Sequence, residues 1–584
     1  MENLIFYLLG FGILLLVFIS TIQILISKKI SWKRMPFDNL IVLFLTSVAL
    51  STLFSSPNKI QALLNPNFGL LMMIFMAVLY FYISHNNGTM KQWNNLTIFS
   101  SVFLSLITIV FYFQPFKNIS PGFTPVGSQL DLAVLLVFFV IYEIVSFPRR
   151  RESIQSWIPV FTGMTLILNF VAIFLTIYSL VKVRTGLDLS LQLPMPPFRL
   201  SWFAALESLK NPLTALIGVG PDNFAAIFTR VKDFAYNQSP LWQFESFSVS
   251  HSAILQIITE TGIFGLITFG LLIFSVFKQF VGVGRDRPVS IILFVYLIIC
   301  LFAFPPSLIV WFLFFVTLGL INQTPTTDVR TIHELSLPIY IGIIAISFLL
   351  IATSGYFLGR SYASEYYFKK SADGFTNKNL REVYENQRQA IILNPFIERF
   401  HTNFAQTNFV IANNVSSKIK NNKLSEQDRQ TITQAIQAGI AESKTSVSLN
   451  PQKAVNWQGL AAVYLNIINT AKDADAWTIS AYQRAILADP QNPNYRVALG
   501  GVYYSQKKYD DALRFFEQAV TLKPDWANAN YNLAWANFQK KNYPQAVNAM
   551  QNALKLIDPK KDKSDYEKVK KELEDFKKML PKTK

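Results

Sequence analysis

Cysteine and histidine are scarce in this sequence, which contains one cysteine and four histidines among 584 residues. The single thiol, Cys300, excludes any disulfide within the chain, so packing alone has to hold the fold together. It also excludes a structural metal site built from several Cys and His side chains. The fold is therefore neither cross-linked by disulfides nor stabilised by a metal site of that type.

Charged residues are also few. They make up 15% of the chain, whereas hydrophobic residues make up 51% and aromatic residues 14%. This composition is too apolar for an ordinary soluble protein. Long apolar runs recur in the first part of the chain, and polar residues are spread throughout the rest. We therefore predict an all-α protein with a transmembrane helix bundle at residues 1–360, an external domain at 361–559 and a basic tail at 560–584.

The apolar runs define about ten candidate spans, because a hydrocarbon core about 30 Å thick needs roughly 20 apolar residues of helix and flanking residues complete shorter runs. Two of these runs are separated only by Pro305 and Pro306. Proline cannot continue a helix, and the two runs together are too long for one span, so we expect a hairpin there. The candidate spans are 4–27, 40–53, 68–84, 96–113, 130–147, 157–181, 254–277, 289–304, 307–321 and 337–359.

Basic residues in short loops predict the orientation, because cytoplasmic loops are enriched in Lys and Arg. Every second loop is basic, whereas the intervening short loops contain only Lys59 and Lys117. We therefore expect the N-terminus, the turn at Pro305, the long connection 182–250 and the C-terminal domain on the extracytoplasmic side. The residues that define the cytoplasmic side are Lys28, Lys29, Lys33, Arg34, Lys91, Arg149, Arg150, Arg151, Lys278, Arg285, Arg287 and Arg330.

The C-terminal domain contains an internal repeat. Residues 495–524 align with residues 529–558, with a period of 34 residues. This period, with small residues where two helices touch and a proline after the second helix, resembles the tetratricopeptide repeat. We expect a third unit before these two, with a longer turn between its helices, and two degenerate units that end near Pro395 and Pro451.

Stacked repeats of this kind form a concave groove, because each helical pair needs a neighbour to cover its apolar face. We expect a right-handed superhelix whose groove binds a protein partner, with residues 560–584 as a capping helix and tail. The net charge of +17 on a protein with a large external part favours anionic membrane lipids or polymers as further partners, and no nucleic acid.

The long connection 182–250 has the pattern of a folded loop on the membrane surface. An apolar stripe with helical spacing is followed by Asn211 and Pro212 as a helix stop, by the glycine turn GVGPDNF, and by renewed helical spacing from Asn223. The residues of the stripe are Leu200, Phe203, Ala204, Leu206 and Leu209.

Three features follow one another around this loop: Arg199 three residues before a tryptophan, then GVGPDNF, then His251 at the start of a span that continues as ETGIFGL. In this order and spacing the membrane region resembles the O-antigen ligase and O-antigen polymerase family. The stretch SPGFTPVGSQLDLAVLL also resembles a glycine-rich stretch of that family, with Asp131 or Gln129 in place of the usual Asn. Ser252 replaces the Asn that commonly follows the histidine.

This resemblance implies an inverting glycosyltransferase of the GT-C type in a bacterial plasma membrane. Such an enzyme moves a glycan from a polyprenyl diphosphate carrier to a glycan, lipid or protein acceptor on the external leaflet, without a metal ion or another cofactor. We favour a ligase, because a large external domain suits a bulky acceptor; a repeat-unit polymerase and a protein O-glycosyltransferase share the same motifs. Two other classes stay open: a membrane-anchored scaffold, and a lipid-carrier transporter, which the scarcity of charges within the spans disfavours.

Positive side chains beside the membrane are the candidates for binding the donor. Rupture of a sugar–diphosphate bond builds negative charge on the leaving group, which fixed guanidinium groups stabilise through paired hydrogen bonds. Arg199 and Arg230 are our candidates for this role, and Lys182 and Arg184 are candidates for the same phosphate cradle. All four also have a structural interpretation, as anchors at the membrane interface.

The attacking acceptor loses a proton, and His251 is the candidate general base. Its alternative role is that of a helix-entry residue bonded to the backbone or to lipid headgroups. Glu260 lies about 13 Å further along the helix and half a turn out of phase, so it is a separate catalytic candidate, with a structural carboxyl as its alternative role. Gly218 and Gly220 are predicted to shape the loop, with backbone contact to a phosphate as their functional alternative.

Overall fold

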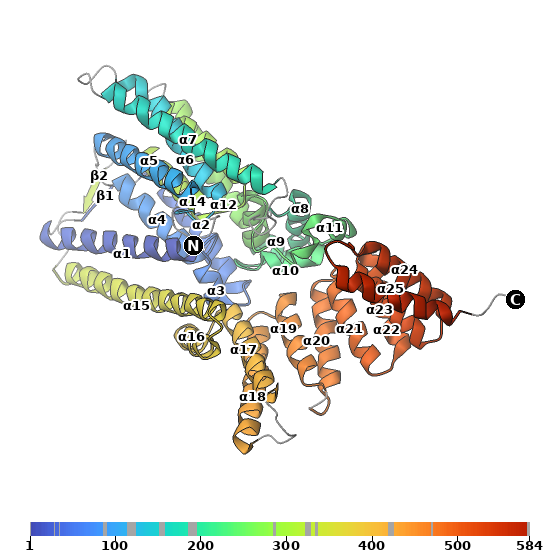
Figure 1. The fold of residues 1–584 in the computed structure, drawn as a ribbon. Coiled ribbons are helices and arrows are strands. Elements are labelled where there is room, and N and C mark those ends of the chain that lie inside the picture. The colour runs from blue at the N-terminus through green and yellow to red at the C-terminus, as the bar shows by residue number, and fades with distance from the viewer. Residues whose placement is uncertain are drawn as a thin grey trace. The chain divides into compact units, whose positions relative to one another are not determined.

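Helices make up nearly all of the described chain (Figure 1), which confirms the all-α prediction. The chain divides into two units. We call Met1–Phe224 with Ser248–Glu365 the membrane unit, and Ala225–Phe247 with Tyr366–Lys584 the repeat unit. The computed structural model describes residues 2–27, 30–33, 35–85, 90–113, 124–150, 158–184, 195–283, 288–321, 329–332, 337–417, 425–468 and 471–580.

Six helices are long and apolar enough to cross a membrane, judged by length and composition. They are α1 (Glu2–Ser27), α5 (Met90–Tyr112), α6 (Gln129–Arg150), α7 (Ile158–Arg184), α12 (Ala253–Val283) and α15 (Leu337–Thr376). Shorter apolar helices accompany them, namely α2 (Asp38–Phe54), α4 (Leu70–His85), α13 (Pro288–Ala303) and α14 (Leu308–Ile321). Every predicted span overlaps one of these helices, and the chain turns at Pro305 and Pro306 between α13 and α14, as the hairpin prediction requires.

Aromatic side chains fill the centre of the membrane unit. Trp311 of α14 is fully buried, and the rings of Phe44, Phe68 and Phe269 lie 5.7 to 6.4 Å from it. These rings come from α2, from the turn before α4 and from α12, so one aromatic cluster joins α14 to two other helices and a turn. On α15, by contrast, large apolar side chains such as Leu349 are 63% exposed. A face of this kind suits lipid and not water.

Two short strands join two distant loops of the membrane unit. β1 (Ile30–Lys33) pairs antiparallel with β2 (Val329–Ile332), with Ile30 opposite Ile332. Both strands lie in loops that the basic residues assign to the cytoplasmic side. The ladder therefore places these two loops at the same end of the helix bundle.

The long connection 182–250 contains a helix directly after α8 (Phe198–Ser208) that the sequence analysis did not predict. α8 ends before Asn211 as expected, but the same Asn211 then starts α9 (Pro212–Ile217), because its side chain accepts a hydrogen bond from the N–H of Leu213 at 2.9 Å. Asn at an N-cap and Pro at the first position favour a helix start. The interpretation of Asn211 and Pro212 as a stop alone was therefore wrong.

The predicted apolar stripe of α8 is also only partly buried. Leu200 and Ala204 are buried, whereas Phe203 and Leu206 are exposed. Small residues, Ser201, Ala205 and Ser208, complete the buried face of this helix. Close packing selects such small side chains, and a search for hydrophobic residues overlooks them.

Ten helices of the repeat unit stack in antiparallel pairs, and we call them the repeat array. α21 and α23 begin at Pro493 and Ala527, which reproduces the period of 34 residues. The array consists of α16 (Leu380–Leu393), α17 (Glu398–Ser417), α18 (Glu426–Leu449), α19 (Ala454–Asn466), α20 (Ala474–Ala488), α21 (Pro493–Ser505), α22 (Tyr509–Leu522), α23 (Ala527–Gln539), α24 (Tyr543–Leu556) and α25 (Lys563–Lys578).

Small residues allow the helices of the repeat array to approach one another. Ala512 and Ala546 are fully buried, and a Cβ atom added at Gly500 would lie 2.6 Å from the ring of Phe516. The last helix, α25, buries Val569, Leu573 and Phe576. These three residues cover the apolar face of α24, so α25 is the predicted capping helix.

Candidate functional site

His251 lies immediately before α12 and is held by the start of α8. Its backbone N–H donates to Ser201 Oγ at 3.0 Å, and its ring Nδ1 lies 2.8 Å from the carbonyl oxygen of Pro196. A carbonyl accepts only, so in the neutral ring Nδ1 carries the proton and Nε2 presents a lone pair. Nε2 makes no hydrogen bond to any described residue. The half-buried imidazole therefore has the tautomer of a general base.

Arg199 belongs to the same helix turn that holds His251. Phe198, its neighbour, packs edge-on against the imidazole with ring centroids 5.5 Å apart. The exposed guanidinium of Arg199 lies over the ring of Phe203, 5.8 Å from its centroid. The first turn of α8 therefore contacts His251 and also contains Arg199. The imidazole of His251 packs against Phe198, whereas the guanidinium of Arg199 lies over Phe203.

The glycines of GVGPDNF pack against a break in α12. Gly262 has φ 67° and ψ −163°, which interrupts the helix and releases the carbonyl groups before it. The N–H of Val219 donates to Thr259 O at 2.9 Å, and the N–H of Gly220 donates to Glu260 O at 3.1 Å. A broken span is tolerated where protein groups satisfy its backbone in this way.

Close approach of two main chains explains why glycine stands at these positions. A Cβ atom added at Gly218 would lie 2.1 Å from the carbonyl carbon of Glu260, and one added at Gly220 would lie 2.3 Å from Ser56 Oγ. The N–H groups of Gly218 and Gly220 both donate to other backbone carbonyls. Neither N–H is therefore available to a phosphate, and the structure favours the loop-shaping role over the phosphate-binding one.

Glu260 is fully buried at the break in α12. Its Oε1 accepts a hydrogen bond from the backbone N–H of Phe224 at 3.2 Å, and its Oε2 is buried without a hydrogen bond to any described residue. Its side chain thus binds the end of the glycine loop. The sequence argument that Glu260 is not the direct partner of His251 agrees with their separate contacts.

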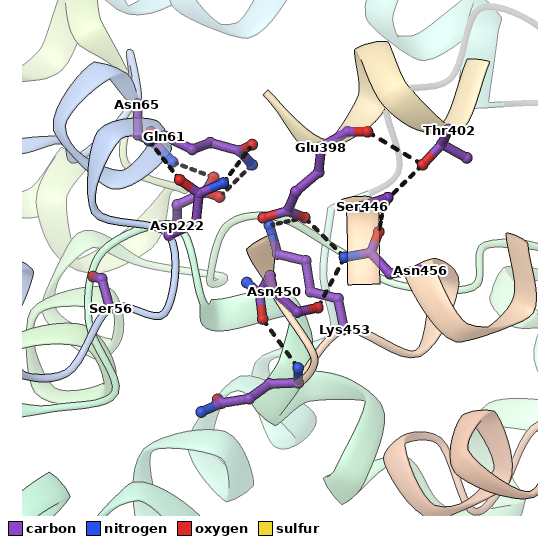
Figure 2. A network of polar contacts seen from close by, with 12 residues as sticks. Ser56, Gln61, Asn65, Asp222, Glu398, Thr402, Ser446, Asn450, Lys453 and Asn456 are labelled. Carbon is purple, nitrogen blue, oxygen red and sulfur yellow. Dashed lines mark hydrogen bonds and ion pairs between the residues drawn. The ribbon is translucent and has the colours of Figure 1, made fainter. Parts of the chain in front are cut away.

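Asp222, which sequence reasoning did not select, fixes the glycine loop on its other side. Figure 2 shows its carboxylate beside Gln61 and Asn65, whose amide groups donate to it at 2.7 and 2.9 Å. These partners belong to α3 (Lys59–Leu64) and to the residue that follows it. The φ of Asp222 is 66°, a left-handed conformation that Asp adopts more readily than most residues. The sequence could have indicated this contact, because Asp222 is the one charged residue of GVGPDNF.

The remaining candidate residues of the sequence analysis lie on other helices than α8. Arg230 lies on α10 (Phe224–Val231) in the repeat unit, with its side chain exposed. Lys182 and Arg184 lie in the last turn of α7, and their side chains fall outside the described part of the structure. Ser252 caps α12, because its Oγ accepts from the N–H of Leu255 at 3.3 Å.

Acidic and metal-binding side chains are dispersed in this part of the molecule. Among the described residues, no three His, Cys, Asp or Glu side chains gather as a metal site. Asp131 is buried at the start of α6, where Ser128 Oγ donates to its carboxylate at 2.7 Å. The contacts of His251 are instead with the start of α8, the helix that also contains Arg199.

Similarity to known proteins is concentrated in the C-terminal part. Two family models described as tetratricopeptide repeats match residues 503–570 and 479–526. The C-terminal part of the chain contains tetratricopeptide repeats. The matched residues include α22 to α24, where the sequence period is clearest. No curated protein matches the chain.

Several solved structures resemble about a third of the chain. A crystal structure of MamA protein is 18% identical and covers 33% of this chain and 91% of its own, with a TM-score of 0.27. TTC0263, a thermophilic tetratricopeptide repeat protein of Thermus thermophilus, is 15% identical and covers 37% and 98%, with a TM-score of 0.27. YrrB, a repeat protein with an unusual peptide-binding site, is 13% identical and covers 32% and 84%, with a TM-score of 0.24.

Proposed function

We propose that the chain is a membrane glycosyltransferase that moves a glycan from a polyprenyl diphosphate carrier to an acceptor on the external face of a bacterial plasma membrane. The observation that carries this proposal is the state of His251, whose Nδ1 is engaged by Pro196 O at 2.8 Å while Nε2 stays open. A base of this kind, next to the helix that bears Arg199, suits a transfer in which the acceptor loses a proton and the donor loses a diphosphate.

The reaction follows from these groups. The acceptor oxygen or nitrogen forms a bond to the anomeric carbon of the sugar, and its proton passes to Nε2 of His251. The bond between that carbon and the diphosphate oxygen breaks, and the diphosphate leaves with the electron pair. Arg199 stabilises the negative charge that develops on this leaving group. No metal ion takes part in the proposed step.

The surface of α8 and α9 suits a lipid-linked donor. Trp202 and Leu206 of α8 and Leu213 and Leu216 of α9 are 42 to 58% exposed. Apolar side chains of this size on short surface helices bury themselves in the interface of a bilayer. They support a position of Arg199 beside the headgroups, where the diphosphate of a polyprenyl carrier lies.

The topology proposal draws support from the β ladder. β1 and β2 join the loops that contain Lys33 and Arg330, both of which the positive-inside rule assigns to the cytoplasm. Two loops lie on the same side of a membrane only if an even number of spans separates them, and the predicted spans meet this condition. The same set of predicted spans gives the proposed external position of His251 and of the repeat array. The repeats are proposed to bind a protein partner on that side.

Reconstituted transfer tests this function. Purified protein in liposomes, supplied with a polyprenyl diphosphate glycan and either glycan, lipid or peptide acceptors, is expected to form one conjugate and to release the carrier diphosphate. His251→Ala and Arg199→Ala should each abolish most of this turnover, whereas Lys540→Met, a surface change in the repeat array, should retain it. Identification of the product separates ligase, polymerase and protein O-glycosyltransferase. Full cellular function of the His251→Ala variant would instead identify a scaffold.

A further inference from the structure

His401 is the only histidine in the sequence of the repeat unit. It lies on α17, where its side chain is 4% exposed. Histidine is the side chain whose charge ordinarily changes between about pH 5 and about pH 8. A buried imidazole in this position is therefore a group through which a change of pH near neutrality can act on the repeat array.

Both ring nitrogens of His401 face hydrogen-bond acceptors. Nδ1 lies 2.5 Å from Glu442 Oε2 of α18, and Nε2 lies 2.8 Å from the carbonyl oxygen of Pro395 in the turn before α17. A carbonyl and an ionised carboxylate accept only, whereas a neutral imidazole has one donor nitrogen and one acceptor nitrogen. The two contacts therefore require a proton on each ring nitrogen. The doubly protonated ring is positively charged and forms an ion pair with Glu442.

Hydroxyl and amide groups continue the contact between α17 and α18 towards α19. Thr402, the next residue of α17, lies 2.9 Å from Ser446 Oγ of α18, which donates to Asn456 Oδ1 of α19 at 3.0 Å. Figure 2 shows these side chains together with Glu398, whose carboxylate accepts from Asn456 Nδ2 at 3.2 Å. Hydroxyl and amide groups do not change their charge near neutral pH. The imidazole therefore adds a pH-dependent part to a contact that is otherwise insensitive to pH.

Other charged or titratable groups lie around α17 on the helices that pack against it. On the side of α19, Lys453 Nζ lies 3.2 Å from Glu398 Oε2. Towards α15, the guanidinium of Arg399 lies 5.4 Å from the ring centroid of Phe368, and Tyr384 of α16 packs its ring against α17. Side chains of these types ordinarily titrate well away from neutral pH. None of these groups is hydrogen-bonded to the imidazole.

We propose that His401 and Glu442 form a pH-sensitive switch within the repeat unit, which fastens α17 to α18 and to the turn before α17 while the imidazole carries its second proton. Loss of this proton leaves a ring nitrogen whose lone pair faces an acceptor oxygen, which is unfavourable for a buried group. The folded unit therefore holds a proton that the unfolded chain releases. The free energy of unfolding then falls as the pH rises through the range in which imidazole loses its charge. This inference is independent of the proposed function.

Hydrogen exchange of the full-length protein in lipid nanodiscs tests the switch. Between about pH 5.5 and about pH 8, the protection factors of α17 and α18, corrected for intrinsic exchange rates, are expected to fall by about tenfold, while those of α23 and α24 stay unchanged. His401→Gln and Glu442→Gln should both remove this pH dependence. Glu442→Gln should also keep the contact at the higher pH, because an amide donates to a neutral ring.

Thr402→Val is the matched control, because it removes the hydroxyl next to His401 and changes no charge. It should lower the protection of α17 and α18 by the same factor at both pH values. Unchanged protection of α23 and α24 shows in every variant that the repeat unit is folded. Equal protection of α17 and α18 at both pH values in the wild type would overturn the switch, as would a pH dependence that persists in His401→Gln.

Nuclear magnetic resonance of 15N-labelled histidine measures the charge of the ring directly. The signals of His401 are identified by their absence from His401→Gln. At about pH 6 they are expected to show a proton on both ring nitrogens, as the two acceptor contacts require. A ring with one unprotonated nitrogen at that pH would contradict the ion pair with Glu442 and overturn the proposal.

Discussion

Replacement of Gly262 by alanine tests the close approach between α12 and the glycine loop. The backbone of Gly262 has φ 67° and ψ −163°, a region that only glycine occupies readily, so a side chain there costs about 1 to 3 kcal/mol. The new Cβ atom would also lie 2.6 Å from the backbone nitrogen of Gly218 and the carbonyl group of Leu216. Overpacking of this kind costs roughly 1 to 3 kcal/mol more. The expected loss is therefore about 2 to 6 kcal/mol.

Gly270→Ala is the matched control, because Gly270 lies in the same helix and a Cβ atom there would meet nothing within 4 Å. This change is expected to be neutral or to stabilise by up to about 1 kcal/mol, the difference in helix propensity. The assay is thermal unfolding of the purified full-length protein in detergent, with hydrogen exchange of residues 216–222 as the local readout. Equal melting temperatures for the Gly262 and Gly270 variants, with an unchanged loop, would refute the packing argument.

Three further predictions concern other regions. Phe576→Ala should destabilise the repeat array by about 3 to 5 kcal/mol, because its buried ring stacks on Phe538 at 4.2 Å, whereas Phe375→Ala at a 59% exposed position should have little effect on unfolding by denaturant. Burial raises the pKa of Asp489 above its ordinary value of 3.8, and Lys232 opposes this shift only in part. The folded protein then holds this proton at a pH where the unfolded chain releases it, so the free energy of unfolding falls as the pH rises through that window; Asp489→Asn should flatten this slope in thermal melts. Asp222→Ala should speed hydrogen exchange of residues 218–224, with an unchanged rate as the contrary result.

The sequence predicted most of the architecture where a regular pattern is repeated. Apolar runs identified the helices that are candidates for crossing a membrane, because lipid requires a continuous apolar surface. The period of 34 residues identified the repeats, and α21 and α23 begin with that spacing. Pro305 and Pro306 identified a turn, since proline removes a backbone donor. The apolar runs and the repeat period are reliable signals because many residues meet the same local requirement. The prolines are a reliable signal because a single residue is enough to end a helix.

The candidate site was predicted in part. His251 lies before α12 but contacts the start of α8, the helix that contains Arg199. The break at Gly262 was missed, because the residue reads as a small side chain for helix packing, while the decisive property is its positive φ. Asp222 was missed because its partners, Gln61 and Asn65, come from a segment about 160 residues earlier.

The segment 225–247, which belongs to the repeat unit, shows why sequence patterns could not reveal its contacts with the repeats. Two of its contacts, from Thr229 and Asn237, end on main-chain carbonyls, which every residue has. Only the pair of Lys232 and Asp489 involves two distinctive side chains, and nothing local relates them across 257 residues. Such a contact favours one fixed attachment, because a buried charge pairs at a single position whereas apolar surfaces slide. Loss of the repeats would therefore leave the buried charge of Lys232 without its counter-ion.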